Sequence, residues 1–316
     1  LDHLIGAEAA WDPRLARGLM RTDGREGVYD HALIRDGAYA SLPRARRQEL
    51  HARAARWYQG RDPVLRAEQL QAAEDPSAAA AWLEAARGEA AAQRHERAQA
   101  YAARGRGLAA DAQTVFALAC VEADALQDLG RTGDAQAAWQ RALEAAGDDA
   151  ARTRAWFGIA SALRLRDDLD GSTRALDAAA GLAAAAGTDE MRARIHGLRG
   201  NLLFPRGDLD GCRREHEAAL DLAQRAGSAE LEAAALGGLG DAAYLRGHML
   251  TAERRFSACV ALARRQGLTR VEAANLPMVA WTCWFAGRCD EALASVERGI
   301  AGARAIGHLR AEAIAH

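Results

Sequence analysis

Two His-Glu pairs come nearest to a catalytic motif in this chain of 316 residues. His95-Glu96 and His216-Glu217 resemble the start of a zinc-protease sequence, in which a second histidine four residues after the first completes the metal ligands. Neither pair is followed by that histidine. No grouping of serine, histidine and aspartate can be argued either, because the stacked architecture derived below would hold such residues far apart. The sequence therefore predicts no catalytic residue and no metal site, and we expect that this chain is not an enzyme.

Two glycine-rich stretches resemble nucleotide-binding loops only superficially. Gly237-Gly238-Leu239-Gly240 and Gly105-Arg106-Gly107 lie within helical sequence pattern, with no preceding strand to aim a phosphate at a helix N-terminus. A P-loop also requires a lysine, and all 41 cationic residues of this chain are arginine. We therefore expect no nucleotide cofactor here. Small residues that let helices approach closely explain these glycines better.

The cysteines are expected to be small buried hydrophobic residues in a reducing cytosol. They form no CxxC pair, and they are Cys120, Cys212, Cys259, Cys283 and Cys289. A formal charge of −2 gives no electrostatic argument for a nucleic-acid or membrane partner. The sequence has no signal peptide and no apolar run long enough to cross a bilayer. We therefore predict a cytoplasmic protein that binds neither nucleic acid nor membrane.

A repeat of 40 residues sets the architecture that must position any site. Gly207, Gly247 and Gly287 recur at this interval and mark a tight turn inside each unit. A second series at the same interval separates the units and consists of Gly147, Gly187, Gly227, Gly267 and Gly307. The stretches between these glycines are rich in Ala, Leu, Arg and Glu, with apolar residues at helical spacing. Such a period indicates stacked helical hairpins, each unable to bury its apolar face alone.

Within this frame, the order of small and large residues resembles the tetratricopeptide repeat (TPR). One unit carries the pattern at Leu236, Leu239, Gly240, Ala243, Ala252, Phe256 and Cys259, and another carries it at Trp156, Ile159, Ala160, Leu163, Ser172, Leu176 and Ala179. The first small position of the second helix falls at Ala98, Ala135, Ser172, Cys212, Ala252 and Ala292, at intervals of 37, 37, 40, 40 and 40 residues. The standard repeat has about 34 residues. The later second helices are therefore expected to be about two turns longer.

The resemblance implies an all-α fold, namely a right-handed α-solenoid of TPR-like helical hairpins of about 37–40 residues each. We place this array in residues 61–316, after a partial winged-helix or connector segment in residues 1–60. Hairpins are predicted near 77–109, 111–146, 149–186, 189–226, 229–266 and 269–306, with a further one cut short. Both ends of the chain fall inside expected helices, so we expect a piece of a larger protein.

Residues 1–60 lie outside the repeat frame and suit the tail of a winged-helix module. The pattern predicts a helix that ends near Met20, a turn over 22–27, a short strand over 28–31 and a helix from about Leu33.

A second resemblance covers the segments 29–42 and 46–51. It is to the junction in large bacterial signal-transduction ATPases of the STAND type, where an ATPase, a winged helix and a TPR array follow one another. These proteins often also carry a class III nucleotide cyclase or a LuxR-like or related transcription domain. The resemblance implies that His31, Arg35 and Tyr39 are structural junction residues.

In the TPR family the first helices line the concave surface, and the frame transfers the groove-facing positions to this chain. These positions hold Arg154, Arg164, Arg194, Asn201, Phe204, Asp241, Tyr244, Trp281 and Trp284, with Ser161 at one of the same offsets. Phe204, Tyr244 and Trp284 recur at intervals of 40 residues and would form an aromatic ladder for an extended peptide or a helix. Asn201 would bond the backbone of that ligand, and the arginines would attract acidic groups. The alternative is that these side chains pack neighbouring hairpins together.

Two more residues carry expectations. His216 falls at an aromatic core position of the repeat, so we interpret it as a hydrogen-bonded core histidine. Pro277 lies within a first helix, where the loss of one backbone donor predicts a kink that widens the groove.

The sequence thus predicts a non-catalytic sensor or scaffold arm of a multidomain bacterial regulator, which binds a peptide, a protein or a small inducer on its concave face. One alternative is a free-standing TPR adaptor for complex assembly, for which the winged-helix resemblance would be accidental. Another is the regulatory carrier region of a class III nucleotide cyclase.

Overall fold

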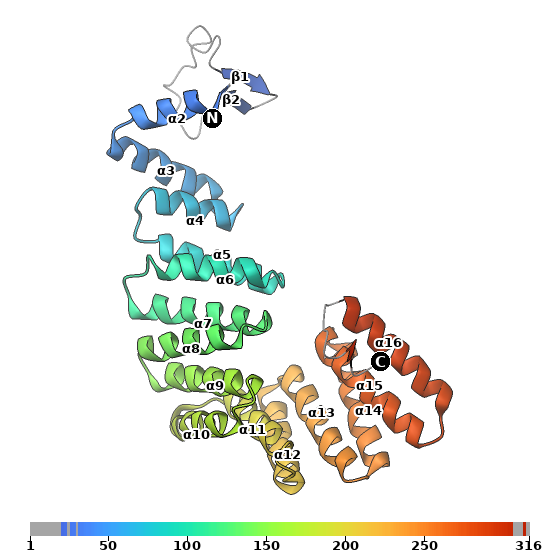
Figure 1. The fold of residues 1–316 in the computed structure, drawn as a ribbon. Helices are drawn as coiled ribbons and strands as arrows, with labels where there is room; N and C mark the ends of the chain where they lie inside the picture. The colour runs from blue at the N-terminus through green and yellow to red at the C-terminus, as the bar shows by residue number, and fades with distance from the viewer. Residues whose placement is uncertain (1–19, 24–25, 30, 306–311, 314–316) are drawn as a thin grey trace. The chain divides into compact units, whose positions relative to one another are not determined.

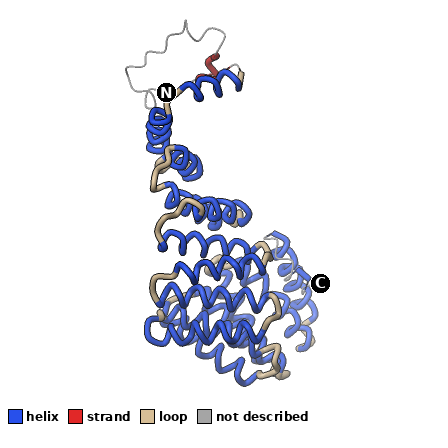
Figure 2. The backbone as a smooth tube through the Cα atoms, turned by 60° about the vertical axis from the view of Figure 1, so that its left-hand side comes forward, coloured by secondary structure: helices blue, strands red, loops and turns tan. Residues whose placement is uncertain are grey.

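A computed structural model describes residues 20–23, 26–29, 31–305 and 312–313 of the chain. Helix makes up nearly all of this described part (Figure 1, Figure 2). The chain divides into two compact units, Leu1–Ala145 and Ala146–His316, named unit 1 and unit 2 here. Within each unit, consecutive helices pack against one another, so both units have the layered organisation of a helical stack.

The described part of unit 1 begins with a small antiparallel hairpin and a helix. These elements are β1 (Met20–Asp23), β2 (Glu26–Tyr29) and α2 (Ala32–Ser41). Met20 pairs with Tyr29 across the two strands. His31 caps α2, because its Nδ1 accepts a hydrogen bond from the backbone N–H of Leu33 at 3.3 Å.

This region agrees only in part with its sequence-based expectation. The strand predicted over 28–31 overlaps β2, and the helix predicted from Leu33 corresponds to α2. The prediction that a helix ends near Met20 is wrong for that residue, which lies in β1, and residues 15–19 are outside the described part. A winged helix over residues 1–60 stays a prediction.

Six further helices follow in the described part of unit 1, and each packs against the next. They are α3 (Arg44–Tyr58), α4 (Pro63–Ala72), α5 (Ala78–Ala91), α6 (His95–Arg106), α7 (Ala112–Asp128) and α8 (Thr132–Ala145). Asp62 and Asp111 begin α4 and α7 by accepting backbone N–H groups of the first turn. Trp82 of α5 is fully buried and packs against Tyr101 of α6, with ring centroids 5.1 Å apart.

The described part of unit 2 contains four hairpins in which first and second helices alternate. The first helices are α9 (Asp149–Leu165), α11 (Asp189–Leu203), α13 (Ala229–Leu245) and α15 (Thr269–Phe285). The second helices are α10 (Leu169–Ala186), α12 (Leu209–Ala226), α14 (Met249–Arg265) and α16 (Cys289–Ala305). The predicted fold class, an α-solenoid of TPR-like hairpins, is confirmed. The division at residue 60 stays a prediction.

The turn inside each hairpin of unit 2 requires a left-handed backbone. Gly207, Gly247 and Gly287 have φ angles of 74°, 75° and 75°. Glycine adopts this conformation without a Cβ clash. The first hairpin differs, because Asp167 takes the equivalent position with φ of 64°. A non-glycine residue there is strained by roughly 1 kcal/mol or more.

Glycines in the first helices let large core side chains approach closely. A Cβ on Gly240 of α13 would come within 3.0 Å of the Phe256 ring of α14, which is fully buried. Pro277 lies inside α15, which continues through it as one helix, and its buried ring packs toward Gly299 of α16. These contacts place both rings in the core, where close packing stabilises the stack.

The later second helices are longer than the earlier ones. α6 and α8 have 12 and 14 residues, whereas α10, α12, α14 and α16 have 18, 18, 17 and 17. At 3.6 residues per turn the difference is roughly one to two turns. The predicted lengthening of about two turns relative to the standard repeat stays a prediction.

The cysteines are free thiols, and all but Cys289 are buried. None of the described helices has both the length and the apolar character that crossing a bilayer would require.

Candidate binding sites in unit 2

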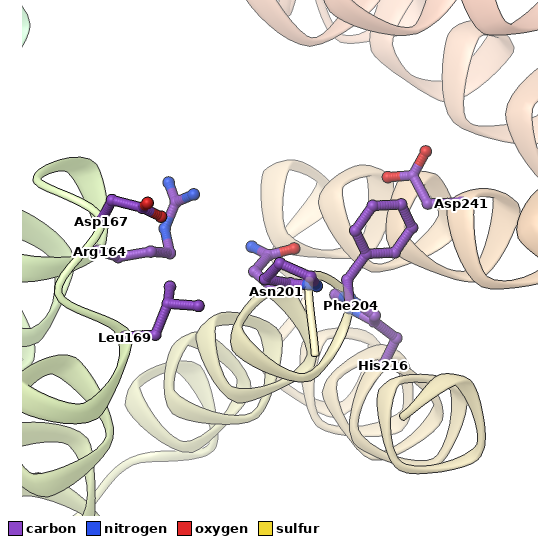
Figure 3. A pocket seen from close by; sticks show the side chains of 8 residues that line it. Arg164, Asp167, Leu169, Asn201, Phe204, His216 and Asp241 are labelled. Atoms are coloured by element: carbon purple, nitrogen blue, oxygen red, sulfur yellow. The ribbon is translucent and has the colours of Figure 1, made fainter. Parts of the chain in front are cut away.

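A polar cleft of about 550 Å³ is lined by residues of α9, α10, α11, α12 and α13 and of the turns beside them. This "polar cleft" is lined by Arg164, Asp167, Leu169, Asn201, Phe204, Pro205, His216 and Asp241. Arg164 and Asp167 lie side by side at the end of α9, and Asp241 of α13 lies on the side away from them (Figure 3). Asn201 and Phe204, at the end of α11, lie between these two sides. The arrangement gathers two carboxylates, one guanidinium, one amide and one aromatic ring around a single opening.

A smaller hollow of about 250 Å³ shares part of this lining. Arg164, Asn201 and His216 border both spaces, and Arg194 and Ser161 line the smaller one. Arg194 also forms an ion pair with Glu190 of its own helix at 2.8 Å. The two spaces therefore form adjoining recesses on the same group of helices.

His216 is the most deeply buried polar residue of the cleft, with only 2% of its surface exposed. A Cβ on Gly200 of α11 or on Gly238 of α13 would come within 3.0 Å of its imidazole. The ring is therefore held between two glycines on neighbouring first helices. The expectation that His216 is a buried core residue agrees with the structure. The expectation that it is hydrogen-bonded does not hold for its Nδ1, which has no hydrogen-bond partner among the described residues.

Burial also sets the charge of this imidazole. Desolvation lowers the pKa of His216 to about 4, and the neighbouring carboxylate of Glu215 acts in the opposite direction. Glu215 accepts a hydrogen bond from His196 Nδ1 at 2.6 Å. At neutral pH, His216 is therefore an uncharged group with hydrogen-bonding capacity beside the cleft.

A second group of side chains forms an exposed aromatic patch on α13 and α15. This "aromatic patch" consists of Tyr244, Trp281, Trp284 and Phe285. Phe285 lies 6.3 Å from Tyr244 and 6.5 Å from Trp281 between ring centroids. Trp281, Trp284 and Phe285 are 46%, 58% and 58% exposed. Tyr244 is half-buried because it also packs against the core around Phe256.

The residues predicted to face one groove thus fall into two groups. The polar cleft contains Arg164, Asn201, Phe204 and Asp241, and the aromatic patch contains Tyr244, Trp281 and Trp284. Arg194 borders the smaller hollow, whereas Arg154 lies exposed on α9 and lines neither space. A ligand site at these residues stays a prediction.

Sequence reasoning missed Asp167 and Phe285 as members of these groups. The 40-residue repeat could have indicated both residues. Asp167 replaces a glycine that recurs every 40 residues, and Phe285 occupies a position that holds exposed leucines at 165 and 245. Among the described residues, no group of three His, Cys, Asp or Glu side chains is arranged to hold a metal ion.

Comparison with known proteins identifies the class of fold. No protein-family model and no curated protein matches the chain. Among solved structures, it is similar to a Signal Transduction ATPase with Numerous Domains (STAND) protein with a tetratricopeptide repeat sensor from Pyrococcus horikoshii, with a TM-score of 0.62 and 12% identity. That alignment covers 96% of this chain and 47% of the other, so this chain spans about half the length of that protein.

Two further structures support the same fold. One is a Rap protein complexed with competence and sporulation factor, with a TM-score of 0.63, 14% identity, and coverage of 84% of this chain and 77% of that one. The other is a tetratricopeptide repeat protein from Parabacteroides merdae, with a TM-score of 0.59, 12% identity, and coverage of 85% and 99%. The chain is therefore a TPR-like α-solenoid.

Proposed function

We propose that this chain is a non-catalytic protein-binding arm of a larger bacterial regulator in the cytoplasm. In this proposal it recognises a protein or peptide partner and transmits that binding to a STAND-type ATPase. The exposed aromatic patch is the observation that carries it. The similarity to a STAND protein with a TPR sensor, and to a Rap protein in complex with a factor, supports this choice of class.

The patch has the features of an interaction surface. Trp281, Trp284 and Phe285 expose about half of their surfaces on consecutive turns of α15. Contiguous exposed aromatic rings are uncommon on monomeric surfaces, and tryptophan and tyrosine supply much of the binding energy where partners meet. The ring packing around Phe285 holds Tyr244, Trp281 and Phe285 in one arrangement before binding, which lowers the entropy cost of association.

The test compares the intact parent protein with the double variant Trp281→Ala/Trp284→Ala. Leu250→Ala is the matched control, because Leu250 is a 72% exposed apolar residue on α14 outside the patch. We expect wild type and Leu250→Ala to capture the same partner from the source cytoplasm, and the double variant to lose it. Circular dichroism should show equal helix content in all three. Equal capture by the double variant would reject the patch as the binding surface.

Measuring ATP turnover by the intact parent tests the second half of the proposal. Turnover that responds to the captured partner, and does not respond in the double variant, is the expected result. A parent without ATPase activity would instead support a free-standing adaptor. A parent that makes a cyclic nucleotide would support the regulatory region of a class III cyclase.

A further inference from the structure

Departures from the repeat frame gather at the polar cleft. The turn position that is glycine at 207, 247 and 287 is Asp167, the position that is aromatic at 204, 244 and 284 is Arg164, and the core position that is Phe256 is His216. All three exceptions line the same space. Asp167 stores backbone strain, and His216 leaves a buried nitrogen without a partner among the described residues. Residues that oppose folding and converge on one cavity indicate a binding site.

The charges of the cleft favour a cationic ligand. Asp167 and Asp241 contribute two carboxylates, and Arg164 contributes one guanidinium. The charge of Asp241 also reaches the core. Burial raises the pKa of the Cys212 thiol to about 11, and the Asp241 carboxylate adds to that rise. A half-buried carboxylate with this influence attracts a positive charge more strongly than one in open water.

The neighbours of Asp241 suit the same chemistry. The ring of Phe204 lies beside Asp241 in the cleft (Figure 3), and an aromatic face next to a carboxylate is a favourable place for an organic cation. Asn201 offers an amide donor and acceptor. His216 is uncharged at neutral pH, so it does not repel a cation and can still form a hydrogen bond.

We propose that the polar cleft binds an organic cation that carries a guanidinium group, with Asp241 and Phe204 holding its charge and Asn201 and His216 bonding its polar groups. The site shares no residue with the aromatic patch, so it is independent of the protein-binding proposal. It supplies a chemical class for the small inducer that the sequence left undefined.

The test uses Nα-acetylated arginine amide (arginine amide below) as the cationic probe and Nα-acetylated citrulline amide (citrulline amide below) as its neutral counterpart of nearly equal shape. Isothermal titration calorimetry on the full chain should show saturable binding of arginine amide at least tenfold tighter than that of citrulline amide. Asp241→Asn should weaken arginine amide at least tenfold. Asp221→Asn is the matched control, because Asp221 pairs with Arg225 on α12 outside the cleft, and it should leave affinity unchanged.

A second variant separates lost binding from lost folding. Asp167→Gly restores the glycine of the other turns, so it should unfold at a temperature equal to or above that of wild type while binding arginine amide severalfold more weakly. Equal affinity for the arginine and citrulline probes would overturn the proposal. So would unchanged arginine amide affinity in Asp241→Asn.

One more comparison identifies the source of the cation. The tripeptide Gly-Arg-Gly and its citrulline analogue, both acetylated at the N-terminus and amidated at the C-terminus, carry the same two side-chain groups within a peptide. Tenfold tighter binding of Gly-Arg-Gly than of arginine amide assigns the site to a side chain of a peptide ligand. Equal or weaker binding of the tripeptide assigns it to a free small molecule. A failure of both cationic probes to exceed their citrulline counterparts contradicts either source.

Discussion

His216 on α12 and Phe256 on α14 occupy the same position of the 40-residue frame, yet they have different surroundings. Phe256 is fully buried beside Gly240, and Met278 of α15 packs against the same cluster. At the position equivalent to Met278, the earlier hairpin has Gly238, and the His216 ring borders both recesses of the cleft. One backbone pattern thus supports a polar recess in one hairpin and a sealed apolar core in the next.

This difference teaches how a repeat acquires a site. The stacking of helices is the same in both places, so the fold tolerates exchange of the side chains that fill the frame. The side chain does change the free energy of unfolding. A buried polar group without a hydrogen-bond partner, such as His216 Nδ1, lowers it by about 1–3 kcal/mol. Selective replacement at matched positions should therefore move stability and binding in opposite directions.

The largest expected effect comes from placing the polar ring in the sealed position. Phe256→His should lower the free energy of unfolding by about 4 kcal/mol, because it removes apolar contacts and buries two ring nitrogens. Urea unfolding followed by circular dichroism measures this change. Phe256→Leu is the control for lost volume and should cost less. The prediction fails if Phe256→His lowers the free energy of unfolding by no more than Phe256→Leu does. Positions 216 and 256 would then tolerate a polar ring equally well.

The reverse exchange, His216→Phe, should alter the pH dependence of stability. The folded pKa of His216 is about 4 against an ordinary value of 6.5, so the unfolded chain binds more protons between these values. Wild type should therefore lose about 3 kcal/mol of stability as pH falls from 6.5 to 4, and the variant should not lose this part.

The measurement for His216→Phe is the urea midpoint at pH 7 and at pH 4. Other charged side chains line the cleft or lie beside the ring, and they remain in both proteins, so their titration is common to both curves. They are Arg164, Asp167, Glu215 and Asp241. His248→Phe is the control, because His248 is exposed on a turn. If His216→Phe and wild type lose stability in parallel on acidification, the burial of a neutral imidazole is not the cause.

The smallest effect concerns the strained turn. Asp167→Gly should raise the free energy of unfolding by about 0.5–1 kcal/mol, since glycine removes the strain of a positive φ but increases the entropy of the unfolded chain. The matched change Gly207→Asp, at a turn with the same geometry, should lower it by a similar amount. Thermal unfolding of both variants gives the comparison. Shifts of the same sign would contradict the equivalence of the two turns.

The helical hairpins could be predicted from the sequence because turns and packing depend on local residue types. Gly207, Gly247 and Gly287 mark left-handed turns, and small residues such as Gly240 mark close approaches. The later second helices, with 17 or 18 residues each, follow the longer repeat interval of the same part of the sequence.

The candidate site was less predictable. Equal spacing of Phe204, Tyr244 and Trp284 suggested one ladder, but spacing along a frame does not determine which way a side chain turns or what fills the gap beside it. Phe204 lines the polar cleft, whereas Tyr244 contacts Phe285. The missing hydrogen bond of His216 Nδ1 depends on the exact neighbours of one atom, which no periodic pattern records.

The uneven burial of the cysteines makes the native sequence suitable for site-specific labelling. Burial raises the pKa of the Cys212 thiol to about 11 and that of Cys259 to about 12, and Cys120 and Cys283 are also buried. Only Cys289, at the first residue of α16, is exposed. A maleimide dye near neutral pH should therefore modify this thiol far faster than the others. Because α16 packs on α15, a single fluorophore would report on the helix that carries Trp281 and Trp284 without any engineered cysteine.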